Sequence, residues 1–571
     1  MRPATVHRSR AIAVLLALVL ALAGCTGLPT SGPVTAGRVP GEAAEDPPTQ
    51  FFAYAPARGA TPEEIVTGFV EAAISPLSSW ETARLFLADS LAESWRPEAG
   101  VIVDVADDRR YEVTGDDSVT LNLTPTATVD EHGTYTTAAS GSVELGFRLT
   151  QREDGEWRIV EAPDGIVLDR QNFPDVYSDH RLAYFDPTWT YLVPDVRWFP
   201  TSGNTATYIV RELVDGAPSP WLAGSVASAF AQDIDLSTGA VPVDTDQVAH
   251  IELNAVAAGA DTTALSRMAA QLDASLANTG VQSVRLTIAG ESSPVQVDPV
   301  QPAQTRPDSR ALVLRNGELG FLSGSELTPL EGLSDAIEDM EGQIDSIAVA
   351  PDRQVAAVQQ STGLVYRVTA DSPDRVDERD DLIAPVIDPF GYVWTVPADD
   401  PGAVVAWDPD LEPFPLAGGW SEASRVHAMA MSRDGSRVAA LVTVGGEQFA
   451  MVASVRRDRA GRPTGLGDAM RTAELAQPGV SIAWIEDARL GIVTSEGDEA
   501  SVIEQQVGGQ AERSNAPNGT RAIEFGTQDS SVRLLGAEGL LYMRRGSSWQ
   551  QTGSEVSVLA TQMGAPQNAD G

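Results

Sequence analysis

The chain has 571 residues, of which 43% are apolar and 21% charged, and its formal net charge at neutral pH is −41. At roughly 100–200 residues per domain, this length allows three to five folded domains, and so acidic a surface repels phosphate, which argues against nucleic-acid binding. All 39 residues counted as Lys or Arg are arginine, so the chain cannot supply the lysine of a P-loop, of a protein-kinase site or of a Schiff base.

The first 25 residues predict an export signal that ends at a cysteine. Arg2, Arg8 and Arg10 precede an uncharged apolar run at residues 11–23. As a helix this run rises about 20 Å, less than the roughly 30 Å of a hydrocarbon core, which predicts a signal peptide rather than a stable membrane span. Cys25 is the only cysteine, so no disulfide can form within the chain.

The sequence LVLALAGCTG around this cysteine resembles a bacterial lipobox. The resemblance implies cleavage between Gly24 and Cys25, a diacylglycerol thioether on the Cys25 sulfur and an acyl chain, such as palmitate, on its new amino terminus. Two or three acyl chains anchor a protein stably, so we expect a lipid-anchored protein on the outer face of the cell membrane. The alternative is an ordinary signal peptide in which the cysteine stands by chance.

Residues 25–50 are rich in proline and glycine and predict an acylated, flexible tether. Such a tether reaches roughly 80 Å when fully extended and about 27 Å as a coil. Removal of residues 1–24 takes away three arginines and no acidic residue, so the net charge of −41 becomes −44. We therefore expect the acyl chains, and no basic patch, to hold the protein to the membrane.

Residues 51–175 predict an α+β domain. TPEEIVTGFVEAAI begins with Thr61 as a helix cap and Pro62 at the first helical position, and residues 80–95 continue in helical spacing. Strands are expected within 100–105, 118–129, 133–151 and 155–163, with Asp154-Gly155 as a hairpin turn. Helices followed by a curved antiparallel sheet resemble an NTF2-like cone, which implies either an interaction domain or a ligand-holding one.

Residues 176–300 predict a second, α/β domain. Expected helices cover 205–216 and 262–280, the latter capped by Thr263 and Gly280, and the expected strands lie within 188–200, 226–236, 240–253 and 281–291. This order resembles the GerMN domain of sporulation and germination proteins. The two central strands carry alternating acids that either bind calcium or form a solvated face; these are Asp233, Asp235, Asp244 and Asp246.

Residues 305–571 repeat a unit of apolar strand, polar turn and second apolar strand. The units begin at 344, 383, 426, 480 and 521, and residues 311–324 add further strands. A four-stranded period near 40 residues is typical of a propeller blade, so an all-β propeller of about six blades is expected, with seven as the alternative. The widest gap holds an arginine-rich insert at 456–471, predicted to be either a mobile surface loop or a binding loop.

Residue types that would indicate an enzyme are scattered along the chain. No two of the five histidines stand at metal-ligand spacing; they are His7, His132, His180, His250 and His427. Trp394 and Trp407 lie on expected strands and are interpreted as blade core. We therefore predict that the chain is not an enzyme and has no catalytic residue, cofactor or metal site.

The lipobox, the GerMN-like centre and a propeller containing AVAPDRQVAA and AMSRDGSRVAAL together resemble the LpqB family of actinobacterial lipoproteins. The resemblance implies an accessory of the MtrA–MtrB two-component system that engages the extracellular part of the sensor kinase MtrB and thereby influences envelope homeostasis and division. Two other functions stay open. One is direct peptidoglycan binding. The other is an envelope hydrolase, for which we expect clustered buried carboxylates of perturbed pKa around the propeller channel.

Overall fold

The computed structural model describes residues 53–138, 141–201, 205–291, 293–303, 305–526 and 531–566. The predicted signal peptide, Cys25 and the tether lie outside these ranges. Within them, no helix is both long enough and apolar enough to span a membrane. The fold class predicted from the sequence, α+β domains followed by an all-β propeller, is confirmed by the sheet topology.

Helix α2 (Pro62–Ala72) begins where the sequence predicts. The hydroxyl of Thr61 accepts a hydrogen bond from the Glu64 backbone N–H at 3.3 Å, and the Glu64 carboxylate accepts one from the Thr61 N–H at 2.8 Å. This capping box satisfies two backbone donors that the first turn leaves without a partner.

The expected continuation of helix through residues 80–95 is wrong. Two short helices, α3 (Glu81–Arg84) and α4 (Asp89–Ser94), flank an extended segment in which Leu87 forms a bridge with Ile159. Backbone hydrogen bonds to β7 hold that segment, Ala88 N–H to Ile159 O at 2.8 Å and Ile159 N–H to Phe86 O at 3.0 Å. Phe86 and Leu87 are buried, so packing against the sheet overrides the local helical preference.

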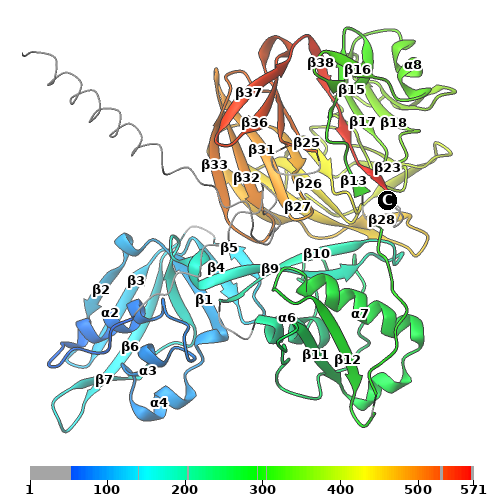
Figure 1. The fold of residues 1–571 in the computed structure, drawn as a ribbon. Coiled ribbons are helices and arrows are strands. Elements are labelled where there is room, and N and C mark those ends of the chain that lie inside the picture. The colour runs from blue at the N-terminus through cyan, green and yellow to red at the C-terminus, as the bar shows by residue number, and fades with distance from the viewer. Residues whose placement is uncertain are drawn as a thin grey trace, which may run out of the picture. The chain divides into compact units, whose positions relative to one another are not determined.

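Two four-stranded sheets complete the first domain (Figure 1). One has the order β2-β3-β6-β7 and is antiparallel; the other has the order β5-β4-β1-β8, in which β1 and β8 run parallel. The strands are β1 (Gly100–Asp104), β2 (Arg110–Val113), β3 (Ser118–Leu123), β4 (Ala127–Asp130), β5 (Tyr135–Thr137), β6 (Val143–Gln151), β7 (Trp157–Glu161) and β8 (Ile166–Asp169). The predicted hairpin at Asp154-Gly155 joins β6 to β7, and strands β2 and β8 were not predicted.

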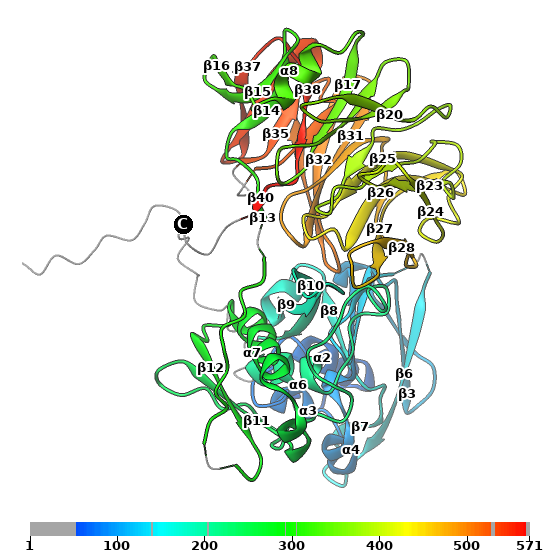
Figure 2. The same cartoon turned by 90° about the vertical axis from the view of Figure 1, so that its right-hand side faces the viewer.

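The second domain is built on a long antiparallel ribbon and a two-stranded parallel sheet. Its elements are α5 (Phe173–Val176), β9 (Tyr177–Phe185), β10 (Leu192–Pro200), α6 (Thr205–Val214), β11 (Val248–Leu253), α7 (Thr262–Leu276) and β12 (Ser283–Ile288). Strand β9 pairs with β10, and β11 pairs with β12. Helix α7 packs against both β9 and β12 (Figure 2).

Three expectations for this domain are wrong in detail. Residues 226–236 form turns rather than a strand, and of 240–253 only β11 is a strand. The N-cap of α7 is Asp261, whose carboxylate accepts the Ala264 N–H at 2.8 Å, so the cap lies two residues before Thr263. The helix ends at Leu276, and Gly280, with φ of +81°, belongs to the turn that follows.

The propeller has six blades of four or five strands, and the chain closes it by pairing its end with its beginning. The inner strands of five blades start at 344, 386, 425, 479 and 522, within three residues of the predicted unit starts. The remaining blade joins both ends of the propeller sequence. In it, β38 (Val556–Leu559), near the C-terminus, pairs with β14 (Ala311–Arg315), near the start. Figures 1 and 2 show β38 in the same blade as β15 and β16.

The other propeller elements, in chain order, are as follows. They are β13 (Thr305–Arg306), β15 (Glu318–Ser323), β16 (Glu326–Thr328), α8 (Leu333–Glu338), β17 (Ile344–Val349), β18 (Ala356–Gln360), β19 (Val365–Val368), β20 (Pro373–Asp377), β21 (Val386–Ile387), β22 (Val393–Thr395), β23 (Val404–Trp407), β24 (Pro413–Leu416), β25 (Arg425–Met431), β26 (Arg437–Val444), β27 (Glu447–Arg457), β28 (Pro463–Leu466), β29 (Met470–Leu475), β30 (Gly479–Trp484), β31 (Arg489–Glu496), β32 (Glu499–Gln506), β33 (Ala511–Ala516), β34 (Ala522–Glu524), β35 (Arg533–Leu535), β36 (Leu541–Arg545), β37 (Ser548–Gly553), β39 (Thr561–Gln562) and β40 (Ala565–Pro566).

The arginine-rich insert at 456–471 was predicted to be either a mobile surface loop or a binding loop, and it begins as a hairpin rather than a loop. Strand β27 continues to Arg457 and pairs with β28, which makes an ordered hairpin. The Arg457 side chain is fully buried and donates to Asp388 Oδ2 at 2.7 Å and to the carbonyl oxygens of Gly435 and Gly461. An arginine inside the insert therefore fixes it to the neighbouring blade.

A hydrogen bond and an ion pair also join the second domain to the propeller. The indole N–H of Trp198 donates to the Gly508 carbonyl oxygen at 2.8 Å, and Arg181 forms an ion pair with Glu486 at 2.7 Å. Ala488, from the turn after β30, packs in the same apolar cluster as the core of the first domain. The turn after β30, at residues 485–488, therefore contacts both the first and the second domain.

Candidate functional site

The lipid-attachment site predicted at Cys25, with cleavage after Gly24, lies outside the described residues. The alternating acids of the second domain are described, and they do not converge. Asp244 accepts hydrogen bonds from His250 Nε2 at 2.8 Å and from nearby backbone N–H groups, which lowers its pKa. Among the described residues, no group of three or more His, Cys, Asp or Glu side chains could hold a metal ion.

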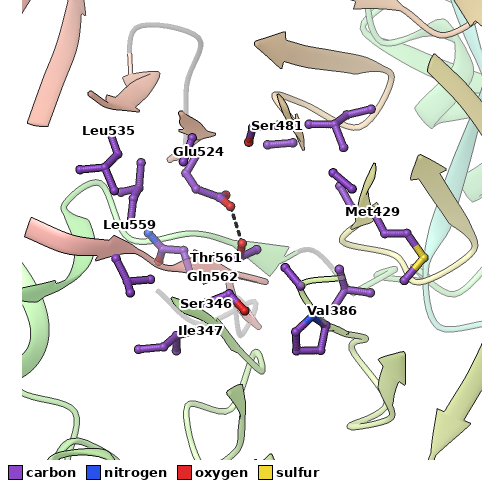
Figure 3. A pocket seen from close by; sticks show the side chains of 18 of the residues that line it. Ser346, Ile347, Val386, Met429, Ser481, Glu524, Leu535, Leu559, Thr561 and Gln562 are labelled. Carbon is purple, nitrogen blue, oxygen red and sulfur yellow. Dashed lines mark hydrogen bonds between the residues drawn. The ribbon is translucent and has the colours of Figure 1, made fainter. Parts of the chain in front are cut away.

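The central channel of the propeller forms a cavity with a volume of about 580 Å³. The innermost strand of every blade lines it: β17, β21, β25, β30, β34 and β38. Its wall combines apolar side chains, such as Ile347 and Met429, with polar ones in comparable measure (Figure 3). That volume is typical of small-molecule sites.

Glu524, at the end of β34, is the acidic group inside this channel. Thr561 Oγ1 donates a hydrogen bond to its carboxylate, and Figure 3 shows the two side chains pointing toward each other. Removal from bulk water raises the pKa of Glu524 to about 7, and the Thr561 hydrogen bond and the charges of Arg433 and Arg533 only partly oppose this. Because the pKa lies near neutrality, Glu524 changes charge in the physiological pH range.

Arg433 lines the same channel from the turn after β25. Its Nη2 donates to the carbonyl oxygens of Ile485 and Gly526, at 3.1 and 3.2 Å. Burial lowers the pKa of Arg433, and the charges of Asp487, Glu486 and Glu524 act against that shift. The guanidinium stays cationic at neutral pH, since an arginine pKa lies far above 7.

Other polar groups of the channel differ in how far their hydrogen bonds are satisfied. Gln562 is committed, because its amide donates to Asp308 and Arg310 carbonyl oxygens and accepts from the Asp308 N–H. The Ser346 hydroxyl is buried and has no hydrogen-bond partner. A buried hydroxyl without a partner is costly, so Ser346 marks a place where the channel wall lacks a polar neighbour.

The hydrolase hypothesis required several carboxylates of perturbed pKa around the channel. The lining acids that the structure describes are Glu524, whose pKa is raised, and Asp345. Asp345 is exposed at the rim, where it accepts a hydrogen bond from Gln343 at 3.2 Å. This geometry gives no acid–base pair of the kind that hydrolysis needs.

A smaller cavity of about 200 Å³ lies in the first domain. Its wall is mostly apolar and includes Phe69, Trp95 and Phe147, whose rings pack against one another. The predicted cone therefore encloses an apolar hollow rather than a cluster of ionisable groups.

Sequence reasoning missed Arg433 and Glu524 as residues of the channel. Arg433 stands in the predicted turn of the unit that starts at 426, so the repeat alone places it at the end of an inner strand. Glu524 is the last residue of a three-residue strand and is one of 80 acidic residues, and no pattern distinguishes it from the others.

The architecture and the channel define the class: a six-bladed β-propeller protein with α+β domains joined to its N-terminal side. Family models match three segments, the Lipoprotein LpqB N-terminal domain at 55–174, a sporulation and spore germination domain at 181–294 and the Lipoprotein LpqB beta-propeller domain at 317–559. The chain belongs to the LpqB family of lipoproteins.

Relatives of this family align over nearly the whole chain. Lipoprotein LpqB of Streptomyces coelicolor is 28% identical, over 95% of this chain and 96% of its own length, and that of Streptomyces avermitilis is 25% identical, over 94% and 95%. Among solved structures, a putative TolB from Agrobacterium tumefaciens covers 47% of this chain and 97% of its own, with 13% identity and a TM-score of 0.32.

Proposed function

We propose that the protein is an extracytoplasmic lipoprotein, anchored through Cys25, that acts as an accessory of a membrane sensor kinase of the MtrB type. The observation that carries the proposal is the family membership, since the domain order of LpqB lipoproteins extends over almost all of the chain. The domain matches and the channel geometry supply no catalytic set. A partner-binding role therefore fits better than a reaction.

Charge and anchoring specify what such a partner needs. The charge after removal of residues 1–24 is −44, so a basic patch on the kinase ectodomain is the simplest complement. A tether of residues 25–50 confines the folded domains near one membrane face, where effective concentration lets a weak contact suffice. The contacts of Trp198 and Arg181 with the propeller give such a partner one continuous surface to bind.

The direct test measures binding of residues 26–571 to the purified kinase ectodomain at low and at high salt. We expect binding that weakens as salt rises, and altered kinase autophosphorylation when the lipidated protein shares a vesicle with the kinase. No binding at low salt together with unchanged phosphorylation rejects the proposal. Retention of the protein on purified cell wall in the same series would then favour the peptidoglycan-binding function.

Anchoring is tested by Cys25→Ala. We expect the variant to lose incorporation of a palmitate analogue and to leave the membrane fraction, because the cysteine thiol is the acceptor of the diacylglycerol group. Equal labelling of wild type and variant contradicts the assignment. Substitution of the neighbouring Thr26→Ala is the matched control and should retain the label.

A further inference from the structure

The channel holds two opposite charges that do not meet. Arg433 and Glu524 act on each other's pKa through their charges, but no direct hydrogen bond or ion pair joins them. Both residues are half-buried, and charges drawn out of bulk water are normally paired in proteins. Two opposite charges that do not contact each other on the wall of one cavity leave room for a ligand that contacts both.

Each group also keeps hydrogen-bonding capacity. The Glu524 carboxylate accepts one hydrogen bond, from Thr561, although two oxygens offer about four acceptor positions. Both hydrogen bonds of Arg433 use Nη2, and within the described residues its Nε and Nη1 have no partner. A donor is therefore missing beside Glu524, and an acceptor is missing beside Arg433.

Other charges act on both groups: Asp487 and Glu486 on Arg433, and Arg533 on Glu524. Glu486 is in an ion pair with Arg181, and Arg533 donates to the carbonyl oxygens of Ser309 and Ser531. The His427 ring is turned to Thr443 and Gln448, and burial lowers its pKa, so it is neutral at pH 7.

We propose that the propeller channel binds a small zwitterion, a free amino acid or a short peptide, with its ammonium group at Glu524 and its carboxylate at Arg433. The cavity of about 580 Å³ is large enough for such a molecule. The apolar wall around Met429 and Val386 accommodates an aliphatic side chain, and the unpartnered Ser346 hydroxyl offers one further hydrogen bond.

The test uses the full chain, purified in detergent, in calorimetric titration and thermal unfolding. The probes are the common free L-amino acids and alanyl-alanine, each with its N-acetylated and its C-amidated form. We expect at least one zwitterion to bind and to raise the unfolding temperature, and loss of either of its charges to weaken binding at least tenfold. No binding by any zwitterion at millimolar concentration overturns the proposal, and so does equal binding of an acetylated form.

Variants assign the two ends of the site. Glu524→Gln should weaken the zwitterion at least tenfold and Arg433→Gln should do the same, whereas Glu326→Gln and Arg513→Gln, at exposed positions on outer strands, should bind as wild type does. If Arg433→Gln does not fold, the comparison of a zwitterion with its amidated form on the wild type still tests that end. Unchanged binding by a folded Glu524→Gln overturns the assignment.

Discussion

Two sets of oppositely charged residues in the same propeller differ in whether the two charges contact each other. Asp388 and Arg457 meet at 2.7 Å with both side chains fully buried. Glu524 and Arg433 face one channel and form no ion pair with each other. The difference lies in the space around them, since the first pair is enclosed between blades and the second borders a cavity of about 580 Å³.

The two carboxylates, Asp388 and Glu524, differ in the same way in the number of hydrogen bonds that they accept. Asp388 accepts from Arg457 Nη2, from the Trp394 indole N–H at 3.0 Å and from the backbone N–H groups of Phe390 and Tyr392. Among the described residues, Glu524 accepts a hydrogen bond from Thr561, and its pKa rises to about 7. The enclosed pair thus serves the stability of the fold. Glu524 and Arg433 keep hydrogen-bonding positions that are not used, which is typical of a functional site.

Breaking the enclosed pair should give the largest effect. Asp388→Ala leaves the Arg457 guanidinium buried without its counter-charge, and loss of one partner of a buried pair costs about 3–5 kcal/mol. We expect urea unfolding to show a loss of this size. Glu161→Ala, in the exposed pair of Glu161 with Arg148, is the control and should move the unfolding midpoint little. A small effect at Asp388 would show that the blade contact contributes little to stability.

Glu524 should give a smaller effect that depends on pH. A folded-state pKa of about 7, above the ordinary 4.5, means that ionisation is harder in the folded protein. Stability from this group is complete below pH 4.5, is lost as pH rises toward 7 and stays low above it. Glu524→Gln cannot ionise, so it should be more stable than wild type at pH 8 by about 2 kcal/mol, since the group borders the open channel and the full shift is discounted.

The measurement for Glu524→Gln is the free energy of unfolding from pH 5 to pH 8.5. Its difference from wild type should grow with pH and level off above 7. Glu326→Gln, an exposed substitution of the same chemistry, should give a difference that is constant with pH. A constant difference for Glu524→Gln as well would contradict the raised pKa.

Much of the fold could be predicted because it repeats locally. Each propeller unit has its own apolar strands and turn, and the turn between β25 and β26 falls in the polar middle of AMSRDGSRVAAL. Errors occur where tertiary contacts override local preference. Leu87 leaves a helical pattern to pair with Ile159, and Arg457 turns a polar insert into a buried hairpin.

The site could not be predicted in the same way. Its wall joins strands from Gln343 to Met563, and the distance of Glu524 from Arg433 in sequence carries no sign of their shared cavity. Sequence can locate an inner strand, but burial sets the pKa of Glu524, and burial arises only after six blades close. Lipidation at Cys25 is the reverse case, a site predicted from a local pattern that lies outside the described residues.

The smallest expected effect concerns the hydroxyl that supports Glu524. Thr561→Val removes the hydrogen bond that Thr561 donates to that carboxylate. This bond lowers the pKa of Glu524, so without it the pKa should rise further above 7. We expect the variant to be less stable than wild type by about 1 kcal/mol at pH 8 and by less at pH 5, where the carboxyl group is protonated and carries no charge to stabilise. Unfolding at the two pH values measures this, and Thr561→Ser, which keeps the hydroxyl, should match wild type at both. An equal loss at pH 5 and pH 8 would mean that Thr561 acts only by packing and that the channel carboxylate does not depend on it.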